Sequence, residues 1–490
     1  MKRCLVAIAV SIGLFTCTFA IFAQESVDRE VIAKIKDEAL KRSQVEETFT
    51  HFTEDIGPRL TGTPAHKQAA EWARDKLKEW GLTNPHLEPW QFGRGWAMDK
   101  LTIEMLEPRY LPLIGYGEAW SPSMAGEIVG APIFLGDKPQ DGIEQMRDKL
   151  KGAIVLSQPI QTVFERADRQ QPTLSDTPVP IGQPRTGAPP LVSRQNMMRM
   201  LNEAGVGVML KPNLGEHGTM FVLGVPGRDT AKTVPSIVLE SEQYNMIARM
   251  IQRGIPVKLR VNLQTRFLTD DRNSYNVIAE LPGSDPVPRD EVVMIGAHLD
   301  SWHSATGATD NADASAVVME AMRILKAIDA HPKRTIRAAL WSGEEEGLLG
   351  SKAYVERYLS GDANKAAREK FDVYFNMDPG TGPIYGWYLE NNEAVKPIFD
   401  AWLEPFRDMG ARRNIIQGIG ATDHLSFIAA GVPGFNAVQD YTNYDVRTHH
   451  TNVDTYERVK LADLRQCAAV MASFAYHAAM RPERIPFNRK

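Results

Sequence analysis

The sequence predicts an α/β protein whose largely parallel sheet carries helices on both faces, with a smaller strand-rich α/β domain inserted into it. From residue 272 onward, continuous apolar strands such as VVMIGAH (292–298) alternate with helical patterns such as ASAVVMEAMRILKAI (314–328). This alternation is typical of a two-sided parallel sheet. Residues 119–271 instead read as short strands around one helix. At 490 residues, the chain is also too long for one ordinary core.

The first 23 residues read as an export signal. Lys2 and Arg3 provide a charged start, an apolar run follows, and Ala23 is a small residue just before Gln24. The run is short for a membrane span and ends in a polar segment, so we expect none in the mature chain. An uncleaved anchor helix is the alternative. The predicted location is outside the cytoplasm, periplasmic or extracellular.

Four segments are predicted in total. After the signal at 1–23, residues 24–118 form the first part of the main domain, residues 119–271 the inserted domain, and residues 272–490 the second part of the main domain. Within the insert, LVSRQNMMRMLNEAG (191–205) predicts a helix capped by Ser193. The Pro- and Gly-rich stretch 170–190 predicts an exposed loop.

Charge and cysteine content indicate which partners and cross-links the protein lacks. A formal net charge of −5 and a pI near 6.2 leave no basic excess, and no Lys/Arg stripe follows the chain, so nucleic acid is excluded as a partner. Of the three cysteines, Cys4 and Cys17 fall within the signal. The mature chain therefore has no internal disulfide, and Cys467, on an apolar helical stripe, is predicted to be buried.

Metal-ligating side chains follow several predicted strands. In sheets of this kind, sites gather at the carboxyl ends of the strands. We predict that His298, Asp310, Glu345, Asp378 and His450 meet there as ligands of dications. Two ions could share one carboxylate and one water, and Asp310, at the start of a helix, is the candidate bridge.

Neighbouring residues have supporting roles. Asp300, two residues after His298, is predicted to accept the free imidazole N–H. Glu344 and Glu345 are adjacent, so one can bind metal while the other takes a proton from water. Spacing alone leaves open which does which.

The motifs GAHLDSW (296–302), TDN (309–311), EEEGLLGS (344–351), NMD (376–378) and HHT (449–451) occur in the same order as in the co-catalytic di-zinc exopeptidases, a family of aminopeptidases. The chain resembles this family over most of its mature length, and most closely its carboxypeptidase Q-like branch. The resemblance implies a mixed sheet flanked by helices. It also implies that the insert is a protease-associated domain.

The resemblance also assigns roles. It implies two Zn²⁺ ions per chain, one held by His298 and Asp378 and the other by Glu345 and His450, with Asp310 bridging. Glu344 would then be the general base. His449 is the rival of His450, but in the family the ligand directly precedes Ser or Thr, here Thr451. ATDHLSF (421–427) resembles a loop near the cleft, so Asp423 is expected either to orient a substrate or zinc-bound group or to cap a helix.

The predicted function is zinc-dependent hydrolysis of the terminal peptide bond of peptides, as an aminopeptidase or dipeptidase acting at a free N-terminus. A carboxypeptidase would use the same metal residues, and a glutaminyl cyclase would use one zinc and a similar pair of glutamates. A binding ectodomain on an inactive peptidase frame is the non-enzymatic alternative. The inserted domain has two open roles, to gate the cleft or to pair subunits into a homodimer.

Overall fold

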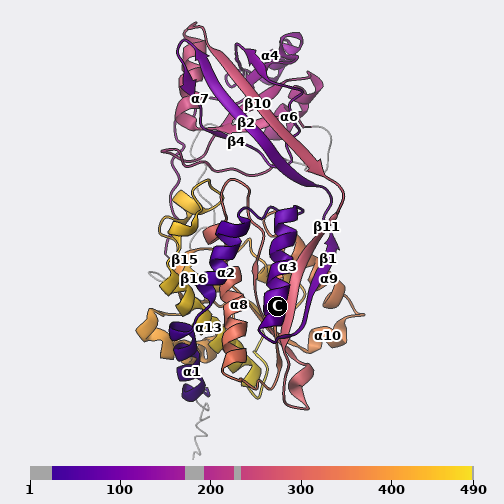
Figure 1. The fold of residues 1–490 in the computed structure, drawn as a ribbon, viewed down its shortest axis with the longest axis vertical. Helices are drawn as coiled ribbons and strands as arrows, with labels where there is room; N and C mark the ends of the chain where they lie inside the picture. The colour runs from indigo at the N-terminus through magenta and orange to yellow at the C-terminus, as the bar shows by residue number, and fades with distance from the viewer. Residues whose placement is uncertain (1–24, 172–191, 226–232, 488–490) are drawn as a thin grey trace, which may run out of the picture.

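The computed structural model describes residues 25–171, 192–225 and 233–487. These residues form two lobes stacked along the long axis of the molecule (Figure 1). The predicted signal at 1–23, with Cys4 and Cys17, lies outside the described residues, as does most of the predicted loop at 170–190.

The lower lobe contains a mixed sheet of seven strands in the order β1-β11-β13-β12-β14-β16-β15. The strands are β1 (Thr83–Gln91), β11 (Asn273–Leu281), β12 (Val292–His298), β13 (Thr335–Trp341), β14 (Phe371–Asn376), β15 (Thr381–Tyr388) and β16 (Gly434–Asp440). Strands β13, β12, β14 and β16 run parallel, while the strands at both edges are antiparallel. The predicted fold class is confirmed.

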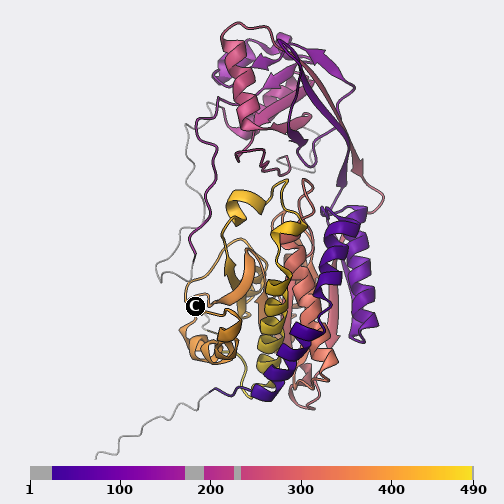
Figure 2. The same cartoon turned by 60° about the vertical axis from the view of Figure 1, so that its left-hand side comes forward.

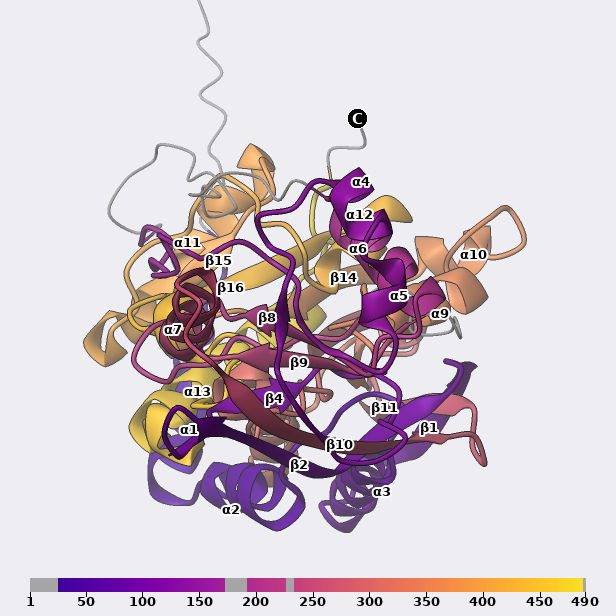
Figure 3. The same ribbon diagram turned by 90° about the horizontal axis from the view of Figure 1, so that it is seen from above.

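Helices cover both faces of this sheet, as the view from above shows with α3 and α9 on opposite sides (Figure 3). The helices of this lobe are α1 (Arg29–Lys41), α2 (Val45–Thr50), α3 (Pro64–Glu79), α8 (Asp313–Ala327), α9 (Leu349–Tyr358), α10 (Lys365–Glu369), α11 (Lys396–Leu403), α12 (His424–Ala429) and α13 (Leu461–Met480). Alternate residues of β12 serve the two faces. Ile295 packs in the core beneath α8 and α13, whereas Met294 packs with Trp341 on the other side.

The upper lobe has two further sheets, ordered β3-β2-β10-β5 and β4-β9-β8-β7-β6. Their strands are β2 (Gly95–Glu107), β3 (Leu111–Pro112), β4 (Gly115–Gly117), β5 (Ile128–Gly130), β6 (Ile133–Phe134), β7 (Ile154–Leu156), β8 (Val208–Pro212), β9 (Ser236–Leu239) and β10 (Lys258–Leu268). The helices are α4 (Gln140–Glu144), α5 (Arg147–Leu150), α6 (Arg194–Glu203) and α7 (Ser241–Gln252). The side chain of Ser193 accepts a hydrogen bond from Asn196 N, so the predicted cap of α6 is confirmed.

A long antiparallel ribbon of β2 and β10 carries the chain between the lobes (Figure 2). It continues the pairing of β1 with β11, so the upper lobe is an insertion between two adjacent strands. The ribbon and β4 also bring residues from Gly95 onward into the sheets of this lobe, ahead of the boundary predicted at 119. A Cβ at Gly95 would lie 1.9 Å from the carbonyl oxygen of Gly62, so only glycine fits where the ribbon leaves the lower lobe.

Cys467 is fully buried on α13, as predicted. Within residues 25–171, 192–225 and 233–487, the structure has no helix that is both long and apolar enough to cross a membrane.

Candidate metal centre

The carboxyl ends of three neighbouring parallel strands bring the predicted ligands together. His298 is the last residue of β12 and pairs in register with Trp341 at the end of β13. Gly296 pairs with Asn376 at the end of β14. The residues that follow these strands therefore emerge at one edge of the sheet, which places Glu344, Glu345 and Asp378 around His298.

All five predicted ligands lie in one cluster, in which His298, Asp310 and Asp378 are buried and the other two are partly buried. His298 Nε2 is 3.2 Å from Asp310 Oδ1 and 3.7 Å from Asp378 Oδ1. His450 Nε2 is 3.4 Å from Asp310 Oδ2 and 2.9 Å from Glu345 Oε2. Asp310 thus contacts both imidazoles through different oxygens, which is the position that a bridging carboxylate requires.

Asp310 is placed by its backbone. It lies in a short turn, Ala308–Ala312, just before α8, where its own backbone is extended (φ −140°, ψ 81°). The carboxylate of Asp454 accepts hydrogen bonds from Thr309 N (2.7 Å) and Asp310 N (3.2 Å). The next residue, Asn311, donates from Nδ2 to the carbonyl of Met377. These contacts join the turn to the segments that carry Asp378 and His450.

The structure separates the two adjacent histidines by their partners. His450 faces Glu345 and Asp310, whereas Nδ1 of His449 lies 3.3 Å from Asp445 Oδ1. A ligand atom of His449 still lies within 4.8 Å of Asp310 and His450. Burial lowers the pKa of His450 to about 4, with Asp310 opposing the shift, so the imidazole is neutral at pH 7 and available as a ligand.

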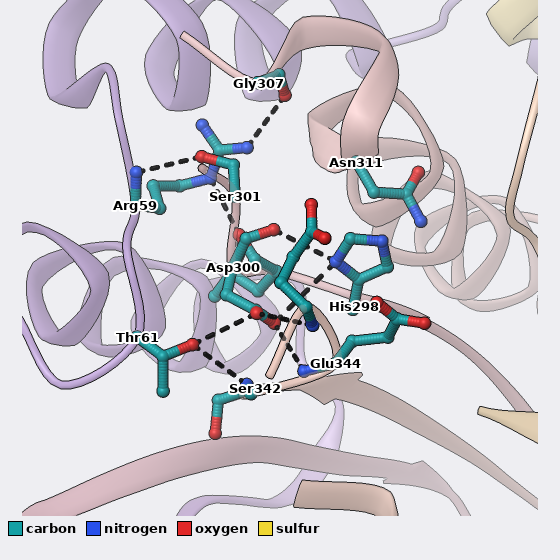
Figure 4. Close-up of polar contacts among 12 residues, drawn as sticks. Arg59, Thr61, His298, Asp300, Ser301, Gly307, Asn311, Ser342 and Glu344 are labelled. Atoms are coloured by element: carbon teal, nitrogen blue, oxygen red, sulfur yellow. Dashed lines mark hydrogen bonds and ion pairs between the residues drawn. The ribbon is translucent and has the colours of Figure 1, made fainter. Parts of the chain in front are cut away.

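Asp300 supports the site differently from the prediction. His298 Nδ1 is 3.0 Å from the backbone carbonyl of Asp300, and the carboxylate is farther away at 3.7 Å (Figure 4). The carboxylate instead accepts hydrogen bonds from Glu344 N, Glu345 N and the hydroxyl of Thr61. The carbonyl therefore replaces the carboxylate as the partner of the imidazole, because the carboxylate is occupied in holding the 344–345 turn.

Arg59 organises the loop between His298 and Asp310. It is fully buried, and its guanidinium donates hydrogen bonds to five backbone carbonyls while its N–H donates to Ser301 Oγ (Figure 4). Those carbonyls belong to Phe52, Gly57, Leu299, Thr306 and Gly307. A planar guanidinium can satisfy several acceptors at once, so it closes a loop that has little regular structure of its own.

Glu344 is buried beside the ligands. Burial raises its pKa well above the usual value; His298 opposes this rise, and Asp378 adds to it. Burial also raises the pKa of Glu345, with Asp310 contributing. Carboxyl groups with raised pKa values in one pocket are typical of a site that exchanges protons or holds cations.

Asp423 lies at the same site and caps no helix. It precedes α12, but its side chain makes no capping hydrogen bond. Burial raises its pKa to about 7, with His298 opposing and Asp300 and Asp378 adding to the rise. The capping alternative is therefore wrong, and the carboxylate lies within electrostatic reach of the ligand cluster.

Sequence reasoning missed three residues that shape the centre. Trp302 donates from Nε1 to Glu345 Oε2 at 2.7 Å, Asp454 binds the turn that holds Asp310, and Arg59 closes the intervening loop. All three lie inside or beside motifs that the sequence presents, HLDSW, HHTNVD and IGPRLTG. Trp302 and Asp454 each lie four residues after a predicted ligand, which is a signal in the sequence, whereas Arg59 lies far from every ligand in the chain.

The donor set fits a pair of borderline dications. Two imidazoles and three carboxylates converge, which is the ligand chemistry that zinc accepts. Nε2 of His298, Oδ2 of Asp310 and Oε1 of Glu345 are buried and form no hydrogen bond within the described residues. Buried polar atoms of this kind normally have a partner, so their convergence indicates a site for cations.

Comparison with known proteins identifies the class of enzyme. Residues 276–475 match Peptidase family M28. The match spans most of the second part of the main domain. Together with the relatives described next, it identifies the chain as a hydrolase and a metallopeptidase, and the predicted likeness to zinc exopeptidases is confirmed. The match to this family and the likeness to a zinc aminopeptidase also indicate zinc dependence.

Individual relatives extend the likeness beyond the matched segment. Mouse (Mus musculus) carboxypeptidase Q is 26% identical over 440 residues, covering 89% of this chain and 85% of the relative. The crystal structure of a peptidase M28 precursor from Shewanella amazonensis SB2B superposes with a TM-score of 0.71 at 26% identity, covering 94% of this chain and 99% of that one. A zinc aminopeptidase from Bacillus subtilis has a TM-score of 0.61 at 18% identity, covering 90% and 96% of the two chains, which supports the shared fold.

Replacing Arg59 by Met should lower the free energy of unfolding by about 3 kcal/mol or more, because it leaves several buried carbonyl groups without a donor. Arg59→Lys should lower the free energy of unfolding by less, because the ammonium still donates hydrogen bonds, although to fewer carbonyls than the guanidinium does. Urea unfolding measures both. Arg29→Met is the control, because Arg29 forms an exposed ion pair with Glu404 and should matter by less than about 1 kcal/mol. Equal losses in the Arg59→Met and Arg29→Met variants would contradict the role given to Arg59.

Proposed function

We propose that the chain is a di-zinc exopeptidase that hydrolyses the first peptide bond of short peptides with a free N-terminus. The observation that carries this proposal is the convergence of His298, Asp310, Glu345, Asp378 and His450, with Glu344 buried beside them. Asp310 is assigned as the bridge, His298 and Asp378 as ligands of one ion, and Glu345 and His450 as ligands of the other.

Zinc bound there would supply a water of lowered pKa and a Lewis acid that polarises the substrate carbonyl. The protein supplies the rest. Glu344 takes the proton from the attacking water and returns it to the leaving amine. The backbone carbonyl of Asp300 keeps the proton of His298 on Nδ1, which leaves Nε2 free for metal. The carboxylate of Asp300 holds the turn that carries Glu344 and Glu345.

The charge of the site supports recognition of an amine. Five carboxyl groups, Asp310, Glu344, Glu345, Asp378 and Asp423, lie in one buried region. Two dications offset most of that charge but leave acidic groups beside them, which favours a protonated N-terminus. Asp423 is proposed to orient the bound substrate, because it is buried near the ligands and caps nothing.

A carboxypeptidase is the second candidate. It is favoured by the likeness to proteins named carboxypeptidase Q over most of both chains. Because both candidates use the same metal centre, only the end of the peptide that is recognised separates them.

Exchange of Glu344 for Gln should reduce kcat by about 10²- to 10⁴-fold, because Gln cannot accept the proton. The zinc content should stay at the wild-type level, since Glu344 is not assigned as a ligand. Plasma emission spectrometry and steady-state kinetics measure the two quantities. Glu356→Gln, an exposed change on α9, is the control. Full turnover in the Glu344 variant would remove it from the role of base.

A panel of dipeptides, free, N-acetylated and C-amidated, identifies the recognised end. We expect hydrolysis of the free and C-amidated forms, loss of activity on the N-acetylated form, and loss of all activity with a zinc chelator. The reverse preference would establish a carboxypeptidase. Release of pyroglutamate from N-terminal glutamine would indicate a cyclase, and an inert protein with bound zinc would indicate a binding role.

We further propose that the chain is exported and that the inserted lobe is a protease-associated domain. Lys2, Arg3 and the apolar run before Ala23 support export, and the two small sheets inserted between β1 and β11 support the domain assignment. Sequencing the N-terminus of the protein recovered from outside the cytoplasm should give a mature chain that begins near Gln24. Recovery of the intact chain with Met1 in the membrane fraction would favour the anchor helix instead.

A further inference from the structure

The loop that carries His450 is held by the inserted lobe. This loop runs from the end of β16 at Asp440 to the start of α13 at Leu461, so it belongs to no strand of the central sheet. By contrast, His298 is the last residue of β12, and Asp378 lies two residues after the end of β14. The two sides of the metal centre are therefore positioned by different means.

The first contact is a short antiparallel pairing with residues 220–222 of the insert. Val222 N donates to the carbonyl of His450 at 3.0 Å, and Asn452 N donates to the carbonyl of Met220 at 3.1 Å. Met220 N in turn donates to Asn452 Oδ1 at 2.7 Å. The ring of Phe221 lies 5.6 Å from the imidazole of His450, centroid to centroid. The ligand is thus bonded through its own backbone to the other lobe.

The second contact is a segment of the insert, residues 164–171, that lies along the same loop. Arg169 donates to the carboxylate of Asp445 from Nε (2.8 Å), Nη2 (2.7 Å) and its backbone N (3.0 Å). Asp168 accepts hydrogen bonds from Asn443 N (2.6 Å) and Val446 N (3.0 Å). Arg166 Nη1 donates to the carbonyl of His449 at 3.0 Å.

The backbone of His450 needs such support. Its φ is +61°, in the left-handed region that non-glycine residues adopt only at a cost. Contacts from both lobes hold the loop in place. On the lower lobe, Asp454 of this loop binds the turn of Asp310. On the upper lobe, the insert binds the loop through the contacts described above. The insert therefore adds backbone bonds on both sides of His450 to the contacts that its imidazole makes with Glu345 and Trp302.

We propose that Asp168 and Arg169 of the inserted lobe are positioning residues for His450. Occupancy of the metal position formed by Glu345 and His450 then depends on the docking of this lobe, whereas occupancy of the position formed by His298 and Asp378 does not. The inference rests on the two-zinc site proposed above. It gives the insert a role in completing the metal centre, through contacts 275 and more residues apart in the chain.

The test is stepwise binding of zinc to the full-length mature protein and its variants, measured by competition with a chromophoric chelator. Arg169→Ala and Asp168→Ala should each weaken the second ion by about 10- to 100-fold and leave the first unchanged, the range typical of groups that orient a ligand. Arg169→Lys should give a smaller loss, since it keeps the charge but not the bidentate geometry. Glu165→Ala, an exposed change on the same segment, is the matched control and should bind both ions as the wild type does.

A second readout separates positioning from general destabilisation. Cobalt substituted for zinc reports the coordination of each ion by its visible absorption, and the Asp168 and Arg169 variants should alter only the band of the weaker site. Circular dichroism checks that each variant is folded. Asp168→Ala removes no buried cation, so this variant tests the proposal by itself if Arg169→Ala does not fold. Wild-type affinity for both ions in Asp168→Ala and Arg169→Ala, or equal weakening of both, would overturn the inference. A wild-type protein that binds fewer than two ions would overturn the two-zinc site itself, before any variant is made.

Discussion

The parallel pairing of β12 with β13 and β14 is the constraint on which the metal centre depends. Because the three strands point the same way, their last residues lie side by side, and the polar residues that follow converge at one edge. His298 takes part directly as the terminal residue of the middle strand. A shift of register by one residue in β12 would turn His298 to the opposite face of the sheet. The apolar packing of Ile295 and Met294 on the two faces opposes such a shift.

Several carboxylates in one buried pocket repel one another and lose hydration, which destabilises the folded state. Hydrogen bonds from the surrounding backbone offset part of this destabilisation. Backbone N–H groups of residues 344 and 345 bind Asp300, and those of residues 309 and 310 bind Asp454. Arg59 adds a buried positive charge close to both of these aspartates. Within the described residues, Nε2 of His298, Oδ2 of Asp310 and Oε1 of Glu345 lack such partners, which is the electrostatic reason to expect dications there.

The two lobes contribute unequal parts of the centre. The lower lobe alone supplies every proposed ligand, and its strands and the turn before α8 place His298, Asp310 and Asp378. The loop with His450 lies where the lobes meet, paired with residues 220–222 on one side and bound by residues 164–171 along its length. Trp302, which donates to Glu345, is also packed against Trp120 of the insert. An inserted domain in this position can therefore influence the metal site without offering a ligand.

The sequence by itself determined the fold class and the strands and helices of the lower lobe, because apolar periodicity is a local property of the chain. The order of its motifs also identified the residues that cluster. Only the tertiary structure decided which group of Asp300 meets His298, that Asp423 caps no helix, and that Arg59 closes a loop more than two hundred residues away. It also decided that residues from Gly95 onward belong to the sheets of the insert, and that the insert holds the loop of His450. These are contacts between segments distant in sequence, and their partners are chosen by how the two lobes pack, which no local pattern of residues encodes.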